Sequence, residues 1–134
     1  MNNCREIKAE ELDHIIIEGI LEKKGKDIIS IDLSGLDNSV CDSFIISHGD
    51  SGTQVRAIAD HIEEKVKKQL NFNVLHKEGY ENLQWILLDY SSVVVHIFDP
   101  DTRKYYQLEE LWADGKLVRI TEEEFLEIKN ERND

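Results

Sequence analysis

The spacing of apolar residues along the chain predicts two helices. Between residues 5 and 24, apolar side chains recur every three or four positions and so share one helical face: Leu12, Ile15, Ile16 and Ile20. A longer stripe between Ser51 and Leu70 lies opposite charged residues: Val55, Ile58, Ala59, Ile62, Val66 and Leu70. Ser51 or the preceding Asp50 is a suitable N-cap for this second helix.

Five shorter segments have the alternation or the β-branched content of strands, at residues 29–33, 44–47, 72–76, 83–90 and 93–98. Their order among the helices predicts one α/β domain, a mixed sheet of about five strands with helices packed on one face. We expect this domain to occupy residues 1–120. Residues 121–134 have the composition of a fraying acidic C-terminal tail.

The last two predicted strands are separated only by Ser91 and Ser92, so we expect a tight hairpin whose loop fixes the register. Its first face pairs apolar residues and should lie beneath the helices: Tyr90 with Val93, Leu88 with Val95 and Ile86 with Ile97. Its second face mixes aromatic and ionisable side chains: Trp85 opposite Phe98, Leu87 opposite His96 and Asp89 opposite Val94.

The second face should not be fully solvated, because Trp85 beside Phe98 would leave a large apolar patch in water. In one interpretation the segment after Asp99 folds back over it and completes a small second core with Tyr105, Tyr106 and Trp112. In the other, the face stays partly open as a contact surface, since aromatic side chains with charged neighbours are typical of binding hot spots.

The charge balance of the chain favours a basic partner over nucleic acid. Lys and Arg number 16 against 28 Asp and Glu, a formal net charge of −12, which repels phosphate backbones and attracts basic proteins. Solubility alone is an equally good reason for the charge. No apolar run approaches the roughly 20 residues that span a membrane, and the first residues lack signal-peptide features. We therefore expect a cytoplasmic protein without a membrane partner.

Asp99 and Asp101 raise the alternative of an enzyme. Two carboxylates at a strand end can hold Mg²⁺, and a glycine-containing loop before the second helix can hold a phosphate, so a Mg-dependent nucleotidyl- or phosphoryltransferase is conceivable. However, the loop lacks a lysine, and Asp50 would oppose a phosphate. Pro100 and Thr102 fit an ordinary turn with a helix cap equally well.

The cysteines and histidines form no recognisable reactive motif. Cys4 and Cys41 have no C-x-x-C spacing. Cys41 and His48 could act as a nucleophile and a base, but a cysteine in an apolar strand is usually inert. The five histidines are scattered without metal-ligand spacing. We expect no metal, no cofactor and no catalytic residue.

Three ordered motifs resemble the Iojap family, the bacterial ribosomal silencing factors, across roughly residues 27–112. The first is D-x-F-I-I followed by G-x-S. The second joins E-G-Y to W-I-L-x-D-Y and V-V-V-H-I-F, and the third is R-x-x-Y-x-L-E-x-L-W, beginning at Arg103. The order and spacing of the motifs carry the resemblance, which does not extend past Arg119.

The resemblance implies a domain shaped like nucleotidyltransferases, usually a homodimer and without catalysis. It implies docking on ribosomal protein L14 of the large ribosomal subunit, which would block association with the small subunit and repress translation. The family's contact surface then falls on Trp85, Asp89, Tyr90, His96, Phe98, Leu108, Glu109 and Trp112. The hairpin register places four of these on the second face but puts Tyr90 on the first.

Overall fold

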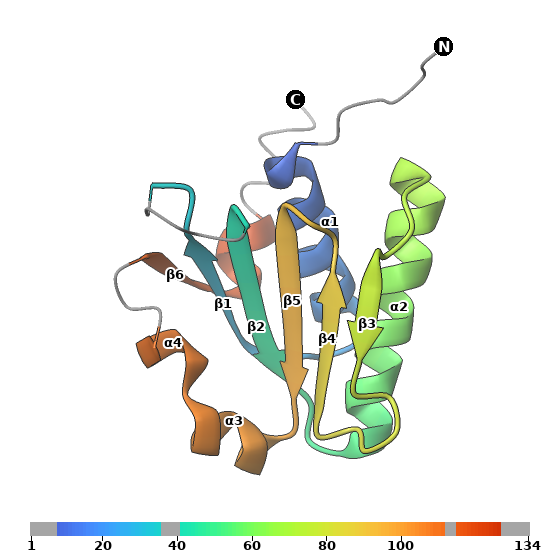
Figure 1. Cartoon of the computed structure of the whole chain (residues 1–134), viewed down its shortest axis with the longest axis vertical. Helices are drawn as coiled ribbons and strands as arrows, with labels where there is room; N and C mark the ends of the chain where they lie inside the picture. Colours follow the sequence, from blue (N-terminus) through green and yellow to red (C-terminus); the bar gives the residue numbers. More distant parts are fainter. Residues whose placement is uncertain (1–7, 36–40, 112–114, 127–134) are drawn as a thin grey trace.

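The computed structural model describes residues 8–35, 41–111 and 115–126 (Figure 1). Its elements are α1 (Ala9–Glu22), β1 (Lys26–Asp32), β2 (Ser43–His48), α2 (Gly52–Leu70), β3 (His76–Glu78), β4 (Trp85–Asp89), β5 (Val93–Phe98), α3 (Pro100–Tyr106), α4 (Leu108–Leu111) and β6 (Lys116–Ile120). A helical turn at residues 122–126 follows β6. Of the helices in these ranges, none is both long enough and apolar enough to cross a membrane.

The described strands form one six-stranded sheet in the order β3-β4-β5-β2-β1-β6. β2 and β5 pair in parallel, and the other described pairs are antiparallel. Figure 1 shows α1 and α2 behind the sheet, whereas α3 and α4 lie at its lower end, where β5 finishes. The predicted single α/β domain with a mixed sheet is confirmed.

The first face of the sheet is covered by the two long helices. The apolar stripes of α1 and α2 join the inward residues of β2, β4 and β5 in one buried cluster, which includes Ile16, Ile58, Ile62, Ile86 and Val95. The two helices are also joined by Lys65, whose Nζ lies 3.0 Å from Oε1 of Glu18. The apolar faces predicted for the two helices therefore form the main core of the domain together with the strands beneath them.

The predicted hairpin register is confirmed at every pair between β4 and β5, from Trp85 opposite Phe98 to Asp89 opposite Val94. The Tyr90 N–H donates to the Val93 carbonyl, and Ser91 takes a positive φ of 74° in the tight turn. Tyr90 itself is 1% exposed and belongs to the first-face core. A two-residue loop therefore fixed which side chains reach each face.

Two strand predictions need correction. Residues 72–75 form no strand, because α2 ends with Asn71 in the left-handed region and Phe72 and Val74 pack against the first-face core from an extended connection. The edge strand forms later, at His76–Glu78. β6, which the apolar spacing did not predict, pairs antiparallel with β1 and completes the other edge of the sheet.

The first part of the predicted tail is folded. The Thr121 hydroxyl accepts a hydrogen bond from the Glu124 N–H at 3.2 Å, which caps the helical turn. Phe125 is 6% exposed, and its ring stacks on His14 of α1 with centroids 4.8 Å apart. The fraying appendage predicted from residue 121 is therefore wrong up to residue 126, and residues 127–134 lie outside the described part.

Candidate functional site

The second face carries a smaller apolar cluster. Its buried members are Ile29, Ile31, Leu33, Cys41, Phe44, Ile46, Val94, Phe98 and Leu108, with Trp85 and Leu87 partly buried beside them. The Trp85 ring stacks on Phe98 at 4.9 Å and meets Tyr106 of α3 at 4.8 Å between centroids. Leu108 of α4 is 8% exposed. The segment after Asp99 thus covers part of this face.

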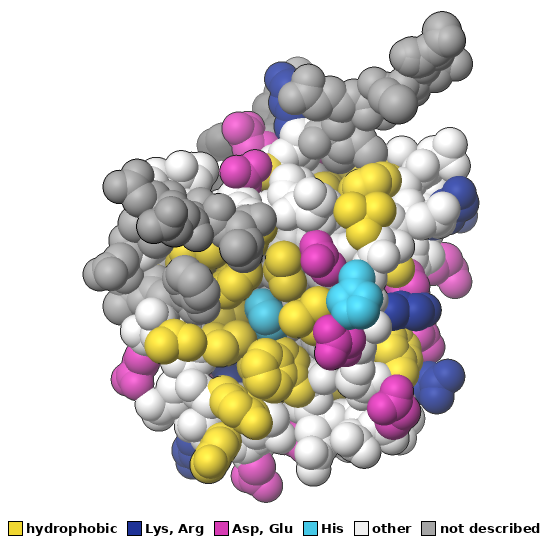
Figure 2. Space-filling model, in the orientation of Figure 1, with side chains coloured by type: hydrophobic (Ala, Val, Ile, Leu, Met, Phe, Trp, Pro, Cys, Tyr) yellow, Lys and Arg dark blue, Asp and Glu magenta, His cyan; other side chains and the backbone are white. Residues whose placement is uncertain are grey.

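The rim of the cluster remains open to solvent. Tyr105 is 81% exposed, Tyr106 49% and Leu111 72%. Figure 2 shows hydrophobic side chains gathered on this side of the molecule, with acidic side chains beside them. Asp89 at the end of β4 and Glu109 on α4 are both partly exposed. The result is an apolar patch with carboxylates at its margin, which is the composition of a protein-binding surface.

The predicted contact residues fall into two groups. Trp85, Asp89 and Glu109 are partly exposed, whereas four are buried: Tyr90, His96, Phe98 and Leu108. Trp112 lies outside the described residues. The expectation that His96 and Phe98 form an open surface is therefore wrong for this conformation. Phe44 from β2 and Trp85 from β4 pack against these rings, so only the edge of the face reaches solvent.

His96 is a buried neutral histidine beneath Trp85. The indole N–H of Trp85 donates to Nδ1 of His96 at 3.1 Å, so the remaining proton of the neutral ring sits on Nε2. That Nε2 is buried and has no hydrogen-bond partner. Burial lowers the pKa of His96 to about 4. The ring therefore supports Trp85 from below and is uncharged near neutral pH.

Asp99 serves as the N-cap of α3. Its Oδ1 accepts a hydrogen bond from the Thr102 N–H at 2.8 Å, and Pro100 occupies the first turn. Asp101 is exposed. Across the described ranges, no three His, Cys, Asp or Glu side chains converge on a possible metal position. The helix-cap interpretation of this stretch is confirmed, and the carboxylate of Asp99 has a structural use.

The glycine-containing loop before α2 is likewise explained by capping. The Ser51 hydroxyl accepts from the Gln54 N–H at 3.2 Å, which identifies Ser51 as the N-cap. Asp50 pairs with Lys26 across 2.7 Å. A phosphate at this helix end would meet the carboxylate of Asp50, so the loop favours no anion.

Gly79 of the E-G-Y motif permits the close approach of two backbone segments. Its φ is 93°, a region that side chains rarely adopt, and an added Cβ would collide with the carbonyl of Trp85. The motif glycine therefore fixes the chain beside the start of β4, where Trp85 enters the second face. In the sequence, only the presence of a glycine at position 79 indicated this backbone contact.

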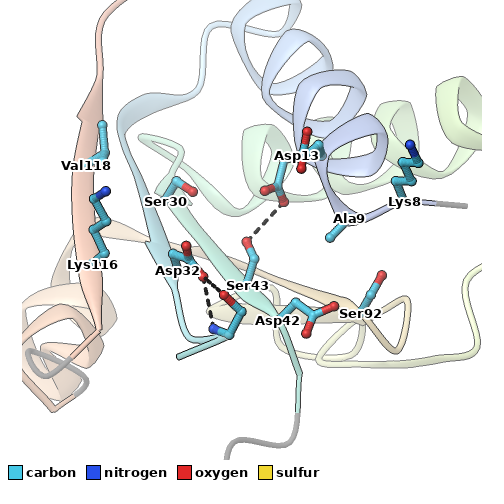
Figure 3. A pocket seen from close by; sticks show the side chains of 12 residues that line it. Lys8, Ala9, Asp13, Ser30, Asp32, Asp42, Ser43, Ser92, Lys116 and Val118 are labelled. Atoms are coloured by element: carbon cyan, nitrogen blue, oxygen red, sulfur yellow. Dashed lines mark hydrogen bonds between the residues drawn. The ribbon is translucent and has the colours of Figure 1, made fainter. Parts of the chain in front are cut away.

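A cavity of about 730 Å³ lies where α1 approaches β1 and β2, lined by Asp13, Asp32 and Asp42 among serines (Figure 3). Oδ1 of Asp13 accepts from the Ser43 hydroxyl at 3.0 Å. Burial, opposed by that hydrogen bond, raises the pKa of Asp13 to about 6. Four carboxylates against Lys8 and Lys116 give the lining a negative balance, and Ala9 and Val118 are its apolar members.

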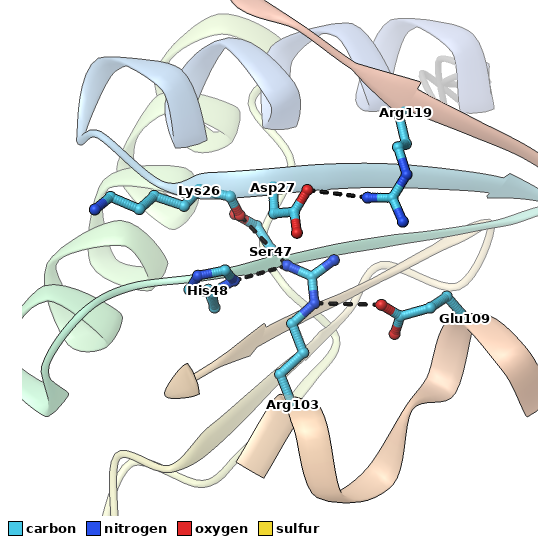
Figure 4. A network of polar contacts seen from close by, with 7 residues as sticks. All are labelled: Lys26, Asp27, Ser47, His48, Arg103, Glu109 and Arg119. Carbon is cyan, nitrogen blue, oxygen red and sulfur yellow. Dashed lines mark hydrogen bonds and ion pairs between the residues drawn. The ribbon is translucent and has the colours of Figure 1, made fainter. Parts of the chain in front are cut away.

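A buried arginine network connects α3 and α4 to the sheet (Figure 4). Nη1 of Arg103 donates to Nδ1 of His48 at 2.8 Å, while its Nε lies 3.5 Å from Oε2 of Glu109. Burial and the nearby guanidinium lower the pKa of His48. In the sequence, Arg103 stands out only as the first residue of the third motif, near Tyr105 and Tyr106.

The suggested Cys41–His48 pair is not formed, because Cys41 precedes the first residue of β2 and His48 is the last residue of that extended strand. Nδ1 of His48 is engaged by Arg103. The Cys41 thiol instead donates to the Ser43 carbonyl at 3.6 Å, and burial raises its pKa. Cys41 is therefore a structural core residue in this fold.

Comparison with known proteins identifies the family. The family model described as "Ribosomal silencing factor during starvation" matches residues 6–134. The chain belongs to this ribosomal silencing factor family. A ribosomal silencing factor of Halalkalibacterium halodurans is 37% identical over 111 residues, covering 83% of this chain and 93% of that protein. The resemblance seen in the three motifs is confirmed, and the expectation that it stops at Arg119 is wrong, because the family model matches through residue 134.

Two further similarities extend the family assignment. A crystal structure of a Chromobacterium violaceum protein has a TM-score of 0.75 and 37% identity, covering 80% of this chain and 88% of that chain. A mouse protein named for mitochondrial assembly of the ribosomal large subunit is 31% identical over 88 residues, covering 61% of this chain and 39% of its own length. The likeness to nucleotidyltransferases stays a prediction.

Proposed function

We propose that this silencing factor family member binds the large ribosomal subunit through ribosomal protein L14 and blocks association with the small subunit, which represses translation. The observation that carries the proposal is the apolar patch with an acidic margin on the second face, centred on Trp85 between Phe98 and Tyr106. The name of the mouse relative supports a large-subunit partner. The net charge of −12 suits a basic ribosomal protein.

The patch offers both parts of a binding site. Trp85, Tyr106 and Leu111 supply apolar area for anchoring, and Asp89 can pair with lysine or arginine to set orientation. Glu109 faces Arg103 instead and its Oε1 is buried, so it acts within the support of the surface. An interface of standard size buries roughly 800 Å² on each partner. His96, Phe98 and Leu108 act from beneath, by holding Trp85 and α4 in place. Such a site inhibits by steric exclusion and uses no chemical step.

We also infer a cytoplasmic homodimer, which the family resemblance supports. Sedimentation velocity of the chain at several concentrations measures that state directly. A monomer at all concentrations would remove the dimer from the proposal and leave the docking surface in place.

The first test measures binding to purified large subunits by co-sedimentation at low and at raised salt. Truncation of Trp85 to alanine should weaken binding by about 2 kcal/mol or more, roughly 30-fold, because the central anchor is lost. Leu126→Ala is a matched control, since Leu126 is 50% exposed but lies beside α1, away from the second face. Circular dichroism establishes that both variants are folded.

The second test measures subunit joining in sucrose gradients and binding to isolated ribosomal protein L14. Wild type should reduce the fraction of joined ribosomes and bind L14, and Trp85→Ala should do neither. A folded Trp85→Ala variant that binds and blocks joining like wild type would contradict the site. Binding to large subunits without an effect on joining would contradict the steric mechanism.

A further inference from the structure

The contact segment, formed by α3 and α4, depends on tertiary contacts for its position. α3 has seven residues and α4 has four, and helices this short are marginal in water without tertiary contacts. They are joined at Gln107, which takes a left-handed φ of 47°. Because the segment carries Tyr106 and Leu111 of the proposed contact surface, whatever fixes it against the sheet also fixes the geometry of that surface.

Arg103 is the polar group that connects this segment to the sheet. The residue is 6% exposed, although it belongs to a short surface helix. Its Nη1 reaches β2 at Nδ1 of His48, 2.8 Å away, and β1 at the Lys26 carbonyl, 3.4 Å away. Its Nε faces Oε2 of Glu109 on α4. One guanidinium therefore contacts two strands and the following helix, as Figure 4 shows.

The planar guanidinium of Arg103 can make these contacts at the same time because its N–H groups point in different directions within one plane. Nη1 serves both strands and Nε serves Glu109, whereas an ammonium group carries its three donors on a single nitrogen and cannot span that separation. The contacts are also incomplete, since Nη2 of Arg103 and Oε1 of Glu109 are buried without hydrogen-bond partners. The Arg103–Glu109 pair, at 3.5 Å, is longer than a close bidentate pair of roughly 2.8 Å.

We propose that Arg103 is a positioning residue, which sets α3 and α4 against β1 and β2 and thereby places the contact side chains of the second face for the ribosomal partner. The role in partner binding rests on the proposed function, whereas the placement of the segment can be measured without any partner.

His48 makes this arrangement sensitive to acid. Its Nδ1 accepts from Arg103 only while the ring is unprotonated. The charged groups that face His48 come from α3, from β1 and from the loop after β2: Arg103, Lys26, Asp27 and Asp50, with Glu109 acting through Arg103. Protonation would remove the acceptor and set a second cation against the guanidinium, so the segment should loosen as the pH falls.

Hydrogen exchange of the isolated protein tests the placement. In Arg103→Met, which keeps the apolar stem but loses the donors, protection of amides in residues 100–111 should fall at least about tenfold, with α2 unchanged. Arg103→Lys should be intermediate, because it keeps the charge without the fork. Lys104→Met is the matched control, since Lys104 is the exposed neighbour on the same helix and should exchange like wild type.

Wild-type protection in residues 100–111 of Arg103→Met would overturn the proposal. Loss of α2 protection in both Arg103 variants would overturn it as well, because Arg103 would then support the whole fold. If wild type fails to bind large subunits while the exchange result is as expected, the proposed function fails and the placement role stands.

Large-subunit binding tests the consequence. Arg103→Met should bind at least about tenfold more weakly than Lys104→Met, with Arg103→Lys recovering part of the loss. Equal binding by Arg103→Met and Lys104→Met would contradict the role in presenting the contact surface, given that wild type binds.

A pH series adds a readout that a generally stabilising contact would not change. Protection factors in residues 100–111 of wild type should fall as the pH is lowered from 7.5 to about 5. His48→Asn retains an acceptor near the position of Nδ1 but does not titrate, so this pH dependence should become smaller than in wild type, and the remainder should come from His96. The same pH dependence in His48→Asn and in wild type would contradict the contribution of His48.

Discussion

The two faces of the same sheet differ in how completely helices cover them. The first face is covered by helices of 14 and 19 residues whose apolar stripes are almost wholly buried. The second is covered by helices of seven and four residues, with tyrosine and leucine side chains left in solvent. Three of its polar atoms are buried without partners: His96 Nε2, Arg103 Nη2 and Glu109 Oε1. The first face therefore contains the larger and better packed core, and the second carries the exposed apolar rim that we propose as the contact surface.

The largest expected effect separates the two faces by stability. Ile62→Ala on α2 removes a fully buried side chain from the first-face core and should lower the free energy of unfolding by about 4 kcal/mol. Leu87→Ala on the second face should cost about 1 kcal/mol, because Leu87 is only partly buried. Urea denaturation followed by circular dichroism measures both values. Equal losses would show that the two faces contribute alike to stability.

An intermediate effect concerns the response of the second face to acid. The folded-state pKa of His96, about 4, lies below its ordinary value of 6.5, so the unfolded chain binds more protons between these two pH values. Stability should therefore fall as the pH drops below 6.5, and His96 should account for about 3 kcal/mol of loss by pH 4. His96→Leu should lack this loss in urea titrations between pH 7 and pH 4. If the free energy of unfolding of His96→Leu depends on pH as in wild type, other groups cause the acid sensitivity.

The smallest effect is the pH dependence of stability that Asp13 on α1 causes, and its sign is opposite to that of His96. The pKa of Asp13 is raised from 3.8 to about 6, so the folded state binds more protons in that window and stability falls as the pH rises through it. Asp13→Asn keeps an acceptor for the Ser43 hydroxyl without the charge. It should stabilise the protein by about 2 kcal/mol at pH 7, less than the roughly 3 kcal/mol of the full pKa shift because Asp13 is partly exposed, and hardly at all near pH 3.5. Destabilisation at pH 7 would mean that the carboxylate makes a favourable interaction there.

Much of the fold was predictable because local chemistry decides it. The stripe of α2 and its Ser51 cap follow from helical spacing and from the need to satisfy the first N–H groups. The hairpin register follows from a two-residue loop, which leaves one alignment of β4 with β5. The same alignment predicted that Trp85, His96 and Phe98 share a face.

The candidate site was only half predictable, because burial depends on partners far away in the sequence. The hairpin sequence contains nothing to show that Phe44 packs on His96. It also cannot show that Tyr106 lies over Trp85, or that the guanidinium of Arg103 reaches His48. The predicted contact residues therefore included both exposed side chains at the rim of the second face and buried side chains that pack beneath them.

The sequence by itself determined the α/β class, the helix faces, the hairpin and the family, since each depends on the order and spacing of nearby residues. Only the tertiary structure decided that β6 completes the sheet, that Phe125 enters the core and that His96 and Phe98 lie beneath the surface. The physical reason is that strand pairing and burial join segments distant along the chain, whose apolar patterns are compatible with several partners until the chain is folded.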